Sequence, residues 1–274
     1  MLKKISVLQR KSIQYGFLAI TFANTVMGIV GYTVRDISDK LTWWQCLLIL
    51  LAAFVVVTVI VYFVLRYYQH RSYTTKINGK SVTIKTGNLF HETGWKVIPF
   101  NEYFDTQVDD VIIAHSSLNG IMIDDHIDGK CDELNKVIKD AAFSSSKFLP
   151  MDVNGRKKYP LGRLIPYKDF LMLAFTHFDD QNIAHIGIGE YEQLLIRMWV
   201  EMRRVYVGKD IAIPLIGTGV TTIEGASEKN YTELLRCILC TLKSSKFQPQ
   251  KGITIVLQPE AMDQIDMNAI REEF

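Results

Sequence analysis

The sequence has little of what marks a secreted, disulfide-bonded or nucleic-acid-binding protein. Its 274 residues include 4 cysteines and carry a formal net charge of +2. Four scattered cysteines do not make a disulfide framework, and so balanced a charge is not typical of proteins that bind nucleic acid. The chain also has no internal repeat and no low-complexity tract, so it is not a repeat protein.

Metal and catalytic motifs are equally scarce. Cys237 and Cys240 have the C-x-x-C spacing of redox and zinc sites, but no second pair of cysteines or histidines accompanies them. Both lie in an apolar helical pattern, so we interpret them as buried thiols in a reducing cytosol. The run 124–126, Asp-Asp-His, lacks a further ligand at helical spacing and is interpreted as a turn. We therefore expect no metal site and no catalytic residue, although His177 follows a predicted strand.

Two long uncharged runs, residues 13–34 and 41–65, dominate the first quarter of the chain. Each exceeds the roughly 20 apolar residues that cross a bilayer core. A cleaved signal peptide fits less well, because its apolar region spans only about 7–15 residues. The sequence thus predicts a transmembrane helical hairpin in residues 1–72, with spans at about 13–34 and 42–65. Basic residues flank the hairpin at both outer ends, which predicts a multi-pass membrane protein with both termini in the cytoplasm.

The first span is rich in small and polar residues. Gly16, Ala19 and Ala23 recur at helical spacing, and Asn24 and Gly28 follow them. Small residues let membrane helices approach closely, and a buried Asn can bond to a neighbouring helix. This face either packs against the second span of the same chain or associates with other copies. We assign Asn24 and Gly28 to membrane assembly in a homo-oligomer.

From residue 73 onward, buried strands alternate with amphipathic helices. Asn78-Gly79 predicts a hairpin turn, and residues 143–167 read as a long loop. Strands are predicted at 73–77, 81–84, 96–100, 170–175, 211–216 and 253–257, and helices at 132–142, 190–205 and, capped by Ser227, up to about 245. This alternation predicts an α/β domain with a central, largely parallel sheet between two layers of helices.

One strand end carries a candidate binding loop. The strand 211–216 is followed by Gly217-Thr218-Gly219-Val220-Thr221. Two glycines around a hydroxyl residue let backbone amides approach an anion, as in phosphate cradles. The loop is neither a Walker A motif nor a full G-x-G-x-x-G, and a plain strand-exit turn would use the same residues.

Residues 213–220 resemble the second ligand loop of macro domains, which bind ADP-ribose. Residues 83–89 resemble the macro segment whose Asp contacts adenine, with Asn88 in its place, and residues 96–101 resemble the strand leading to the Asn-containing first loop, here Asn101. The resemblance extends over nearly all of residues 73–274. It implies a macro-like α/β/α three-layer domain with a mostly parallel mixed sheet.

A narrower resemblance rests on residues 98–110 and 117–120 behind a two-helix hairpin. It is to the membrane-anchored macro-domain effectors of bacterial Thoeris anti-phage systems. The resemblance implies a TIR-domain partner enzyme that makes a nucleotide signal from NAD, with histidine-conjugated ADP-ribose as that signal. It also implies that the effector binds the signal, disrupts the lipid bilayer and so provides abortive-infection-type antiviral defence.

The first loop departs from the macro pattern, because residues 102–110 replace its glycine-rich run. This loop positions water in hydrolytic macro domains, so we expect a binder and not an enzyme. The alternatives are a membrane-tethered ADP-ribosyl hydrolase and a scaffold that recruits ADP-ribosylated partners.

The acidic residues of the loop either receive an amine-bearing part of the ligand or form a solvated, capping cluster. They are Glu102, Asp105, Asp109 and Asp110. The expected ligand-binding residues are Asn88, Asn101, Glu102, Asp105, Gly217, Thr218, Gly219, Val220 and Thr221.

Overall fold

The computed structural model describes most of the chain in two compact units. The described residues are 6–29, 42–127, 131–143, 150–151, 155–179, 183–219, 221–225 and 230–274. One unit comprises Met1–Arg71 and Pro259–Ala269, and the other comprises Ser72–Gln258 and Ile270–Phe274. The segment Pro259–Ala269 thus groups with the N-terminal helices, although it lies far from them in sequence.

The first unit is built on two helices, α1 (Val7–Ile29) and α3 (Trp43–Gln69). In the described part of the chain, α3 is the one helix long and apolar enough to cross a membrane. Helix α1 starts before the predicted span, and its first turns contain Arg10 and Lys11. The remainder of the predicted first span, beyond Ile29, lies outside the described residues. The structure therefore supports one membrane-spanning helix, and the prediction of two spans is not confirmed.

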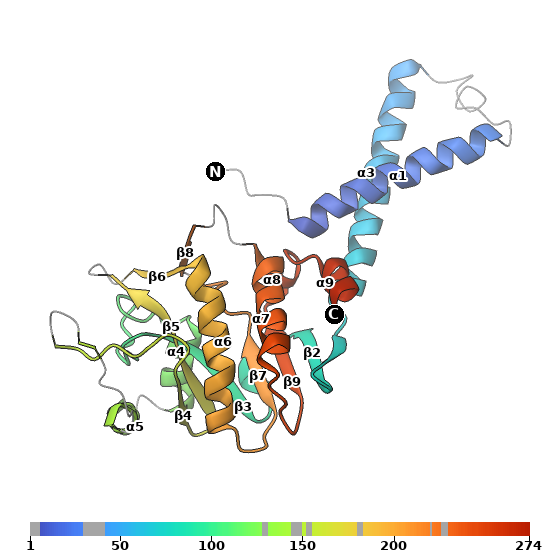
Figure 1. Ribbon diagram of the computed structural model, residues 1–274. Coiled ribbons are helices and arrows are strands. Elements are labelled where there is room, and N and C mark those ends of the chain that lie inside the picture. The colour runs from blue at the N-terminus through green and yellow to red at the C-terminus, as the bar shows by residue number, and fades with distance from the viewer. Residues whose placement is uncertain are drawn as a thin grey trace. The chain divides into compact units, whose positions relative to one another are not determined.

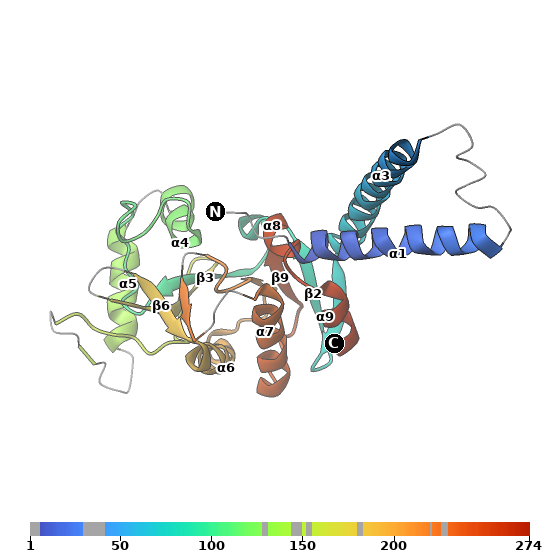
Figure 2. The same ribbon diagram turned by 90° about the horizontal axis from the view of Figure 1, so that it is seen from above.

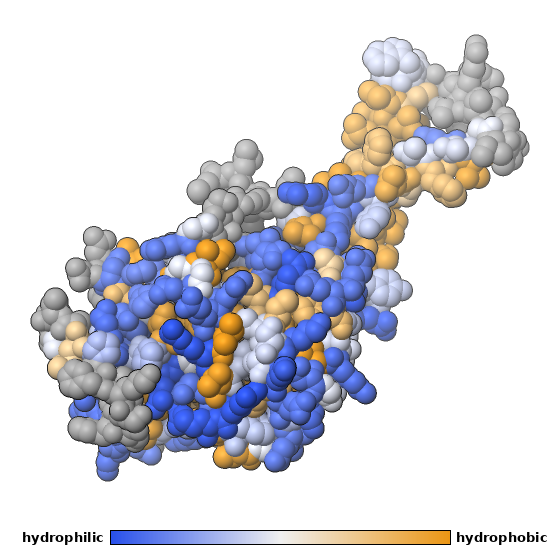
Figure 3. Space-filling view, in the orientation of Figure 1, coloured by the Kyte–Doolittle hydropathy of each residue, from blue (hydrophilic) through white to orange (hydrophobic). Residues whose placement is uncertain are grey.

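The two helices cross where Gly16 meets Thr58. A Cβ atom on Gly16 would lie 2.5 Å from Oγ1 of Thr58 and 3.3 Å from its Cα, so only glycine permits this approach. Away from the crossing the helices separate (Figure 1) and leave side chains such as Phe22 and Trp43 exposed. The orange surface over these helices in Figure 3 marks the same apolar faces.

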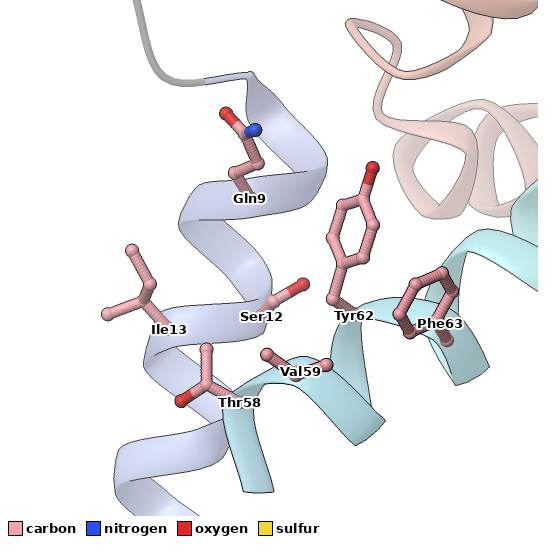
Figure 4. Close-up of a pocket in the computed structure, with 7 residues that line it drawn as sticks. All are labelled: Gln9, Ser12, Ile13, Thr58, Val59, Tyr62 and Phe63. Atoms are coloured by element: carbon pink, nitrogen blue, oxygen red, sulfur yellow. The ribbon is translucent and has the colours of Figure 1, made fainter. Parts of the chain in front are cut away.

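The membrane-assembly residues lie away from this crossing. Asn24 is exposed, and a Cβ on Gly28 would meet no atom within 4 Å. Beside the crossing the helices enclose a hollow of about 530 Å³ (Figure 4), to which α1 and α3 both contribute. Its lining residues are Gln9, Ser12, Ile13, Thr58, Val59, Tyr62 and Phe63. Gly16 thus packs within the chain, whereas Asn24 and Gly28 face outward.

The second unit contains a nine-stranded sheet in the order β1-β2-β9-β7-β3-β5-β6-β8, with β4 paired to β5. The strands are β1 (Tyr73–Ile77), β2 (Lys80–Thr86), β3 (Trp95–Asn101), β4 (Leu164–Tyr167), β5 (Phe170–Phe178), β6 (Ala184–Gly187), β7 (Ile211–Pro214), β8 (Thr222–Glu224) and β9 (Ile253–Leu257). β2, β9, β7, β3 and β5 run parallel, whereas β1, β4 and β6 pair antiparallel. The predicted mostly parallel mixed sheet is confirmed.

Helices cover both faces of this sheet (Figure 2). They are the short helices η1 (Leu89–His91), α4 (Leu118–Ile121) and η2 (Met122–His126), then α5 (Cys131–Phe143), α6 (Ile188–Val205) and α7 (Tyr231–Ser245). Further along the chain, α8 (Pro259–Met262) belongs to the first unit, and the residues of α9 (Met267–Glu273) are divided between the two units. On one face, Ile98 and Phe100 pack with Leu134 and Ile138 of α5. On the other face, α6 and α7 lie together, joined by the bond from Trp199 Nε1 to the Thr241 hydroxyl.

Most predicted elements are present, with three corrections. Asn78 and Gly79 form the predicted turn, with φ of 52° and 77°, and both lie in the left-handed region that such turns need. Helix α7 begins at Tyr231 and is capped by Asn230, not by Ser227, which lies outside the described residues. β4 lies inside the stretch predicted as loop, and the short strands β6 and β8 were not predicted. Such short strands carry too little periodicity to be read from sequence.

Candidate functional site

The predicted ligand residues follow strands that end at one edge of the sheet. Because β2, β9, β7, β3 and β5 are parallel, their carboxyl ends share that edge. Asn88 follows β2, the loop from Leu215 to Thr221 follows β7, and Asn101 ends β3. His177 lies near the end of β5. Open α/β sheets bind ligands at this edge, so the topology gathers these candidates where binding is expected.

The loop after β7 is supported from behind and open in front. Gly217 has φ of +95°, which favours glycine. The Thr218 hydroxyl donates to the Leu215 carbonyl over 2.9 Å, and the Tyr191 hydroxyl donates to the Ile216 carbonyl over 2.8 Å. A Cβ on Gly219 would meet no atom within 4 Å. Thr221 is buried, whereas Val220, also predicted in this loop, lies outside the described residues. The shape suits close approach of an anion to the backbone at Gly219.

Asn88 caps the short turn η1. Its Oδ1 accepts a hydrogen bond from the Phe90 amide over 2.9 Å. The side chain is exposed. An Asp at this position would present only acceptors.

Asn101 is buried and hydrogen-bonded within its own loop. Its Nδ2 donates to Oδ2 of Asp105 over 2.8 Å, and its Oδ1 accepts from the amides of Tyr103 and Asp105 at 3.1 and 3.2 Å. Only 4% of its surface is exposed. The side chain therefore stabilises the conformation of the first loop.

Glu102 lies at the centre of a charged cluster. Its side chain is 4% exposed, with Oε1 3.1 Å from Lys158 Nζ and Oε2 2.9 Å from His177 Nδ1. The second ring nitrogen of His177 lies 3.4 Å from Glu190 at the start of α6. Burial raises the pKa of Glu102, but the bonds from His177 and Lys158 outweigh it and lower that pKa overall. The hydrogen bond with Glu102 raises the pKa of His177, against the opposing effect of burial.

Asp105 is also paired with a cation. Arg156 forms an ion pair with it and lies over the Tyr103 ring, 3.9 Å from the ring centroid. Asp109 and Asp110 instead accept backbone amides of their own turn: Asp109 from residues 111 and 112, and Asp110 from residue 115. The acidic loop is therefore not a free cluster of negative charge. Two of its carboxylates carry a basic partner, and two cap a turn.

Sequence reasoning missed the basic partners of this loop. Lys158 and Arg156 come from the stretch predicted as an insertion, and Glu190 comes from an amphipathic helix. No local pattern joins them to Glu102, because the pairing depends on the tertiary fold. Only the position of His177 at a strand end gave a signal.

The remaining candidate groups have structural surroundings. Burial, followed by the charges of Glu192 and Glu233, raises the pKa of Cys237 to about 11, so its thiol stays protonated near neutral pH. The ring of His126 stacks on Phe90 with centroids 4.5 Å apart. Among the residues that the structure describes, no group of three or more His, Cys, Asp or Glu side chains is arranged to hold a metal ion.

Comparison with known proteins gives a consistent result. Residues 82–258 match the family model described as "Thoeris protein ThsA, Macro domain". The Thoeris protein ThsA of Bacillus amyloliquefaciens (strain Y2) is 35% identical over 207 residues, which cover 73% of this chain and 69% of that protein.

Two solved structures of an Oceanobacillus iheyensis macrodomain are also similar, one with ADP and one with MES bound. Each is 17% identical with a TM-score of 0.44, over 74% of this chain and 98% or 99% of the other.

Proposed function

The chain belongs to the Thoeris protein ThsA macro-domain family, and from that membership we propose that it is a membrane-bound receptor for an ADP-ribose-derived nucleotide. A partner enzyme with a TIR domain makes the signal, and the macro domain binds it. The N-terminal helices then disrupt the membrane, which gives antiviral defence. Histidine-conjugated ADP-ribose is the signal that the resemblance to the membrane-anchored Thoeris effectors implies.

The loop after β7 carries this proposal. The open space beside Gly219 leaves room for a diphosphate, while Tyr191 and Thr218 hold the loop from behind. Backbone N–H groups in such loops favour anions. We assign the diphosphate to Gly217, Thr218, Gly219, Val220 and Thr221, and the adenine to the side of Asn88.

We further propose that the domain binds its ligand without hydrolysing it. Asn101 is buried and hydrogen-bonded within the first loop, and residues 102–110 replace the glycine-rich run that positions water in hydrolytic macro domains. This favours a receptor over the membrane-tethered hydrolase.

The distal end of the ligand is assigned to the first loop. Glu102 is paired with Lys158 and Asp105 with Arg156. A group bound here would therefore meet charges of both signs and not a purely acidic pocket. Such paired charges suit a substituent that itself carries both an amine and a carboxylate.

The membrane part of the proposal starts from α3, with α1 and the residues after it as a second span. Residues 1–72 then form a hairpin in the inner membrane, and residues 73–274 lie on the cytoplasmic side. Asn24 and Gly28, which lie away from the crossing with α3, are assigned to contacts between copies in a homo-oligomer.

Mass spectrometry tests the proposal directly. The full chain would be purified in detergent from cells that also express a TIR-domain partner, and the small molecules released by denaturation would be identified. A compound that contains ADP-ribose and is absent when the partner is inactive is the expected result. If such a preparation releases no such compound and shows no heat of binding with ADP-ribose, the proposal is wrong.

A further inference from the structure

The segment Pro259–Ala269 begins at the end of a strand that lies between the two predicted ligand loops. β9 is flanked by β2 and β7. At its end, the Leu257 carbonyl accepts from the Gly87 amide over 3.1 Å, next to Asn88. The Val256 carbonyl accepts from the Leu215 amide over 3.3 Å, at the start of the loop after β7. The chain thus leaves β9 hydrogen-bonded to the stems of both loops.

The same segment then contacts both N-terminal helices. One carboxylate, Asp263, lies 2.7 Å from Nε2 of His70 and 3.4 Å from the guanidinium of Arg66, at the end of α3. The backbone carbonyl of Asp263 accepts from the Leu8 amide of α1 over 3.3 Å. The Asp263 side chain is 16% exposed, so these pairs are partly protected from water and weaken less with salt than surface pairs do.

Two further interactions repeat this pattern. Asp266 lies 2.7 Å from Nζ of Lys11 in α1. The Gln69 side-chain amide donates to the carbonyls of Met262 and Ile265, both of which belong to buried residues. The segment therefore holds the cytoplasmic ends of α1 and α3 by side chains and backbone together.

After the segment, the chain is fixed again in the second unit. Arg236 Nε of α7 lies 2.6 Å from Oε2 of Glu273. The Thr75 hydroxyl of β1 donates to the carbonyl of Phe274 over 2.6 Å. Both ends of the segment are thus anchored in the sheet domain, while its middle bonds to the helices.

We propose that residues 259–269 are the coupling element that passes the state of the ligand loops to the N-terminal helices. The inference rests on the proposed binding of an ADP-ribose compound at those loops. A ligand changes an equilibrium only when it binds one arrangement better than the other. The loops, β9 and the Asp263 and Asp266 ion pairs form one continuous bonded path along which such a preference reaches α1 and α3.

Hydrogen exchange of the full chain in lipid nanodiscs, with and without ADP-ribose, tests the coupling. In the parent, ADP-ribose slows exchange at residues 215–219 and changes exchange at residues 66–70 and 259–269. Asp263→Asn removes the charge that faces His70 and Arg66 but keeps the shape of the side chain. In this variant ADP-ribose still slows hydrogen exchange at residues 215–219. The change in exchange at residues 66–70 is at most half of that in the parent. Asp169→Asn, which breaks an exposed ion pair with Lys209 before β5, behaves as the parent.

The outcomes separate the two proposals. If the parent shows no slowing at residues 215–219, ADP-ribose does not bind there, and the proposed function fails together with this inference. If the loop responds but residues 66–70 do not, the coupling is wrong and the proposed function stands. Lys11→Gln removes the Asp266 ion pair instead and loses the same response. If Asp263→Asn and Lys11→Gln both show the full change in hydrogen exchange at residues 66–70, the segment 259–269 is not the coupling element.

Discussion

Nδ1 of His177 lies 2.9 Å from Oε2 of Glu102. The pair joins the end of β5 to the first loop, and Lys158 completes it from a third segment of the chain. Glu102 is thus a buried junction and not an exposed acidic residue. Its charge contributes to the shape of the loop, and this contribution is measurable through pH.

We expect Glu102→Gln to alter the pH dependence of stability. The bond with Glu102 raises the pKa of His177 above its ordinary value of 6.5. The proton on His177 therefore stabilises the folded protein fully below pH 6.5. This stabilisation is lost as pH rises through the raised pKa of His177. Without the Glu102 carboxylate most of this loss disappears, because only the weaker contact with Glu190 remains, and the protein is destabilised by roughly 1–3 kcal/mol at pH 6. Thermal unfolding between pH 5.5 and 9 measures both effects.

Glu190→Gln is the matched control, because Glu190 is more exposed and lies 3.4 Å from the other ring nitrogen. It should shift the profile much less. A Glu102→Gln variant whose unfolding temperature follows pH as the parent does would show that the pair contributes nothing in solution.

Gly219→Glu should weaken nucleotide binding without unfolding the domain. A Cβ at Gly219 meets no atom within 4 Å, so the fold tolerates it, whereas the added carboxylate repels a diphosphate. We expect calorimetry with ADP-ribose to show at least about a tenfold loss of affinity, or 1.4 kcal/mol. Gly252→Glu makes the same change at the opposite edge of the sheet, where a Cβ would have only ordinary contact, 3.5 Å from the Ser81 carbonyl. Equal affinities in the two variants would exclude the loop from the site.

The parts of the fold that follow from sequence are those with local causes. The Asn78-Gly79 turn follows from left-handed backbone preference, and β5, α6 and β9 follow from hydrophobic periodicity. The alternation of strands and helices implies that the strands are parallel. Asn88, Asn101 and Gly217 therefore lie at the same edge of the sheet, because each follows or ends a parallel strand.

The parts that could not be predicted depend on contacts between distant residues. Nothing in residues 155–158 indicates that Arg156 and Lys158 pair with the first loop. Likewise, the residues around Asp263 resemble any chain-terminal helix until the fold places them beside His70. The composition of the first span left its partner open, since small residues predict close packing but not whether the partner is the same chain.

The protein should bind ADP-ribose compounds without turning them over. Asn101 is buried and bonded at both amide atoms within its loop. Chromatography after prolonged incubation of the full chain with an ADP-ribosylated protein should detect no free ADP-ribose, while a hydrolytic macro domain in parallel releases it. Release at a comparable rate would favour the hydrolase over the receptor.

The final prediction concerns how the helices act in the membrane. Asn24 lies on an exposed part of α1, away from the crossing of Gly16 with Thr58. In lipid a polar amide is costly unless it is paired, and the proposed homo-oligomer would pair Asn24 with another copy of α1. We therefore expect Asn24→Leu to weaken dye leakage from liposomes that contain the full chain, triggered by the nucleotide identified by mass spectrometry. Its affinity for that nucleotide should not change.

Thr25→Val is the control that separates assembly from simple polarity. The Thr25 hydroxyl already donates to the Thr21 carbonyl of its own helix over 2.9 Å, so it needs no partner in another copy. Its loss should leave leakage unchanged, because the valine is nearly the same size and removes no contact between helices. If Asn24→Leu and Thr25→Val both leak as the parent does, α1 only anchors the protein. The damage to the membrane must then come from another part of the chain.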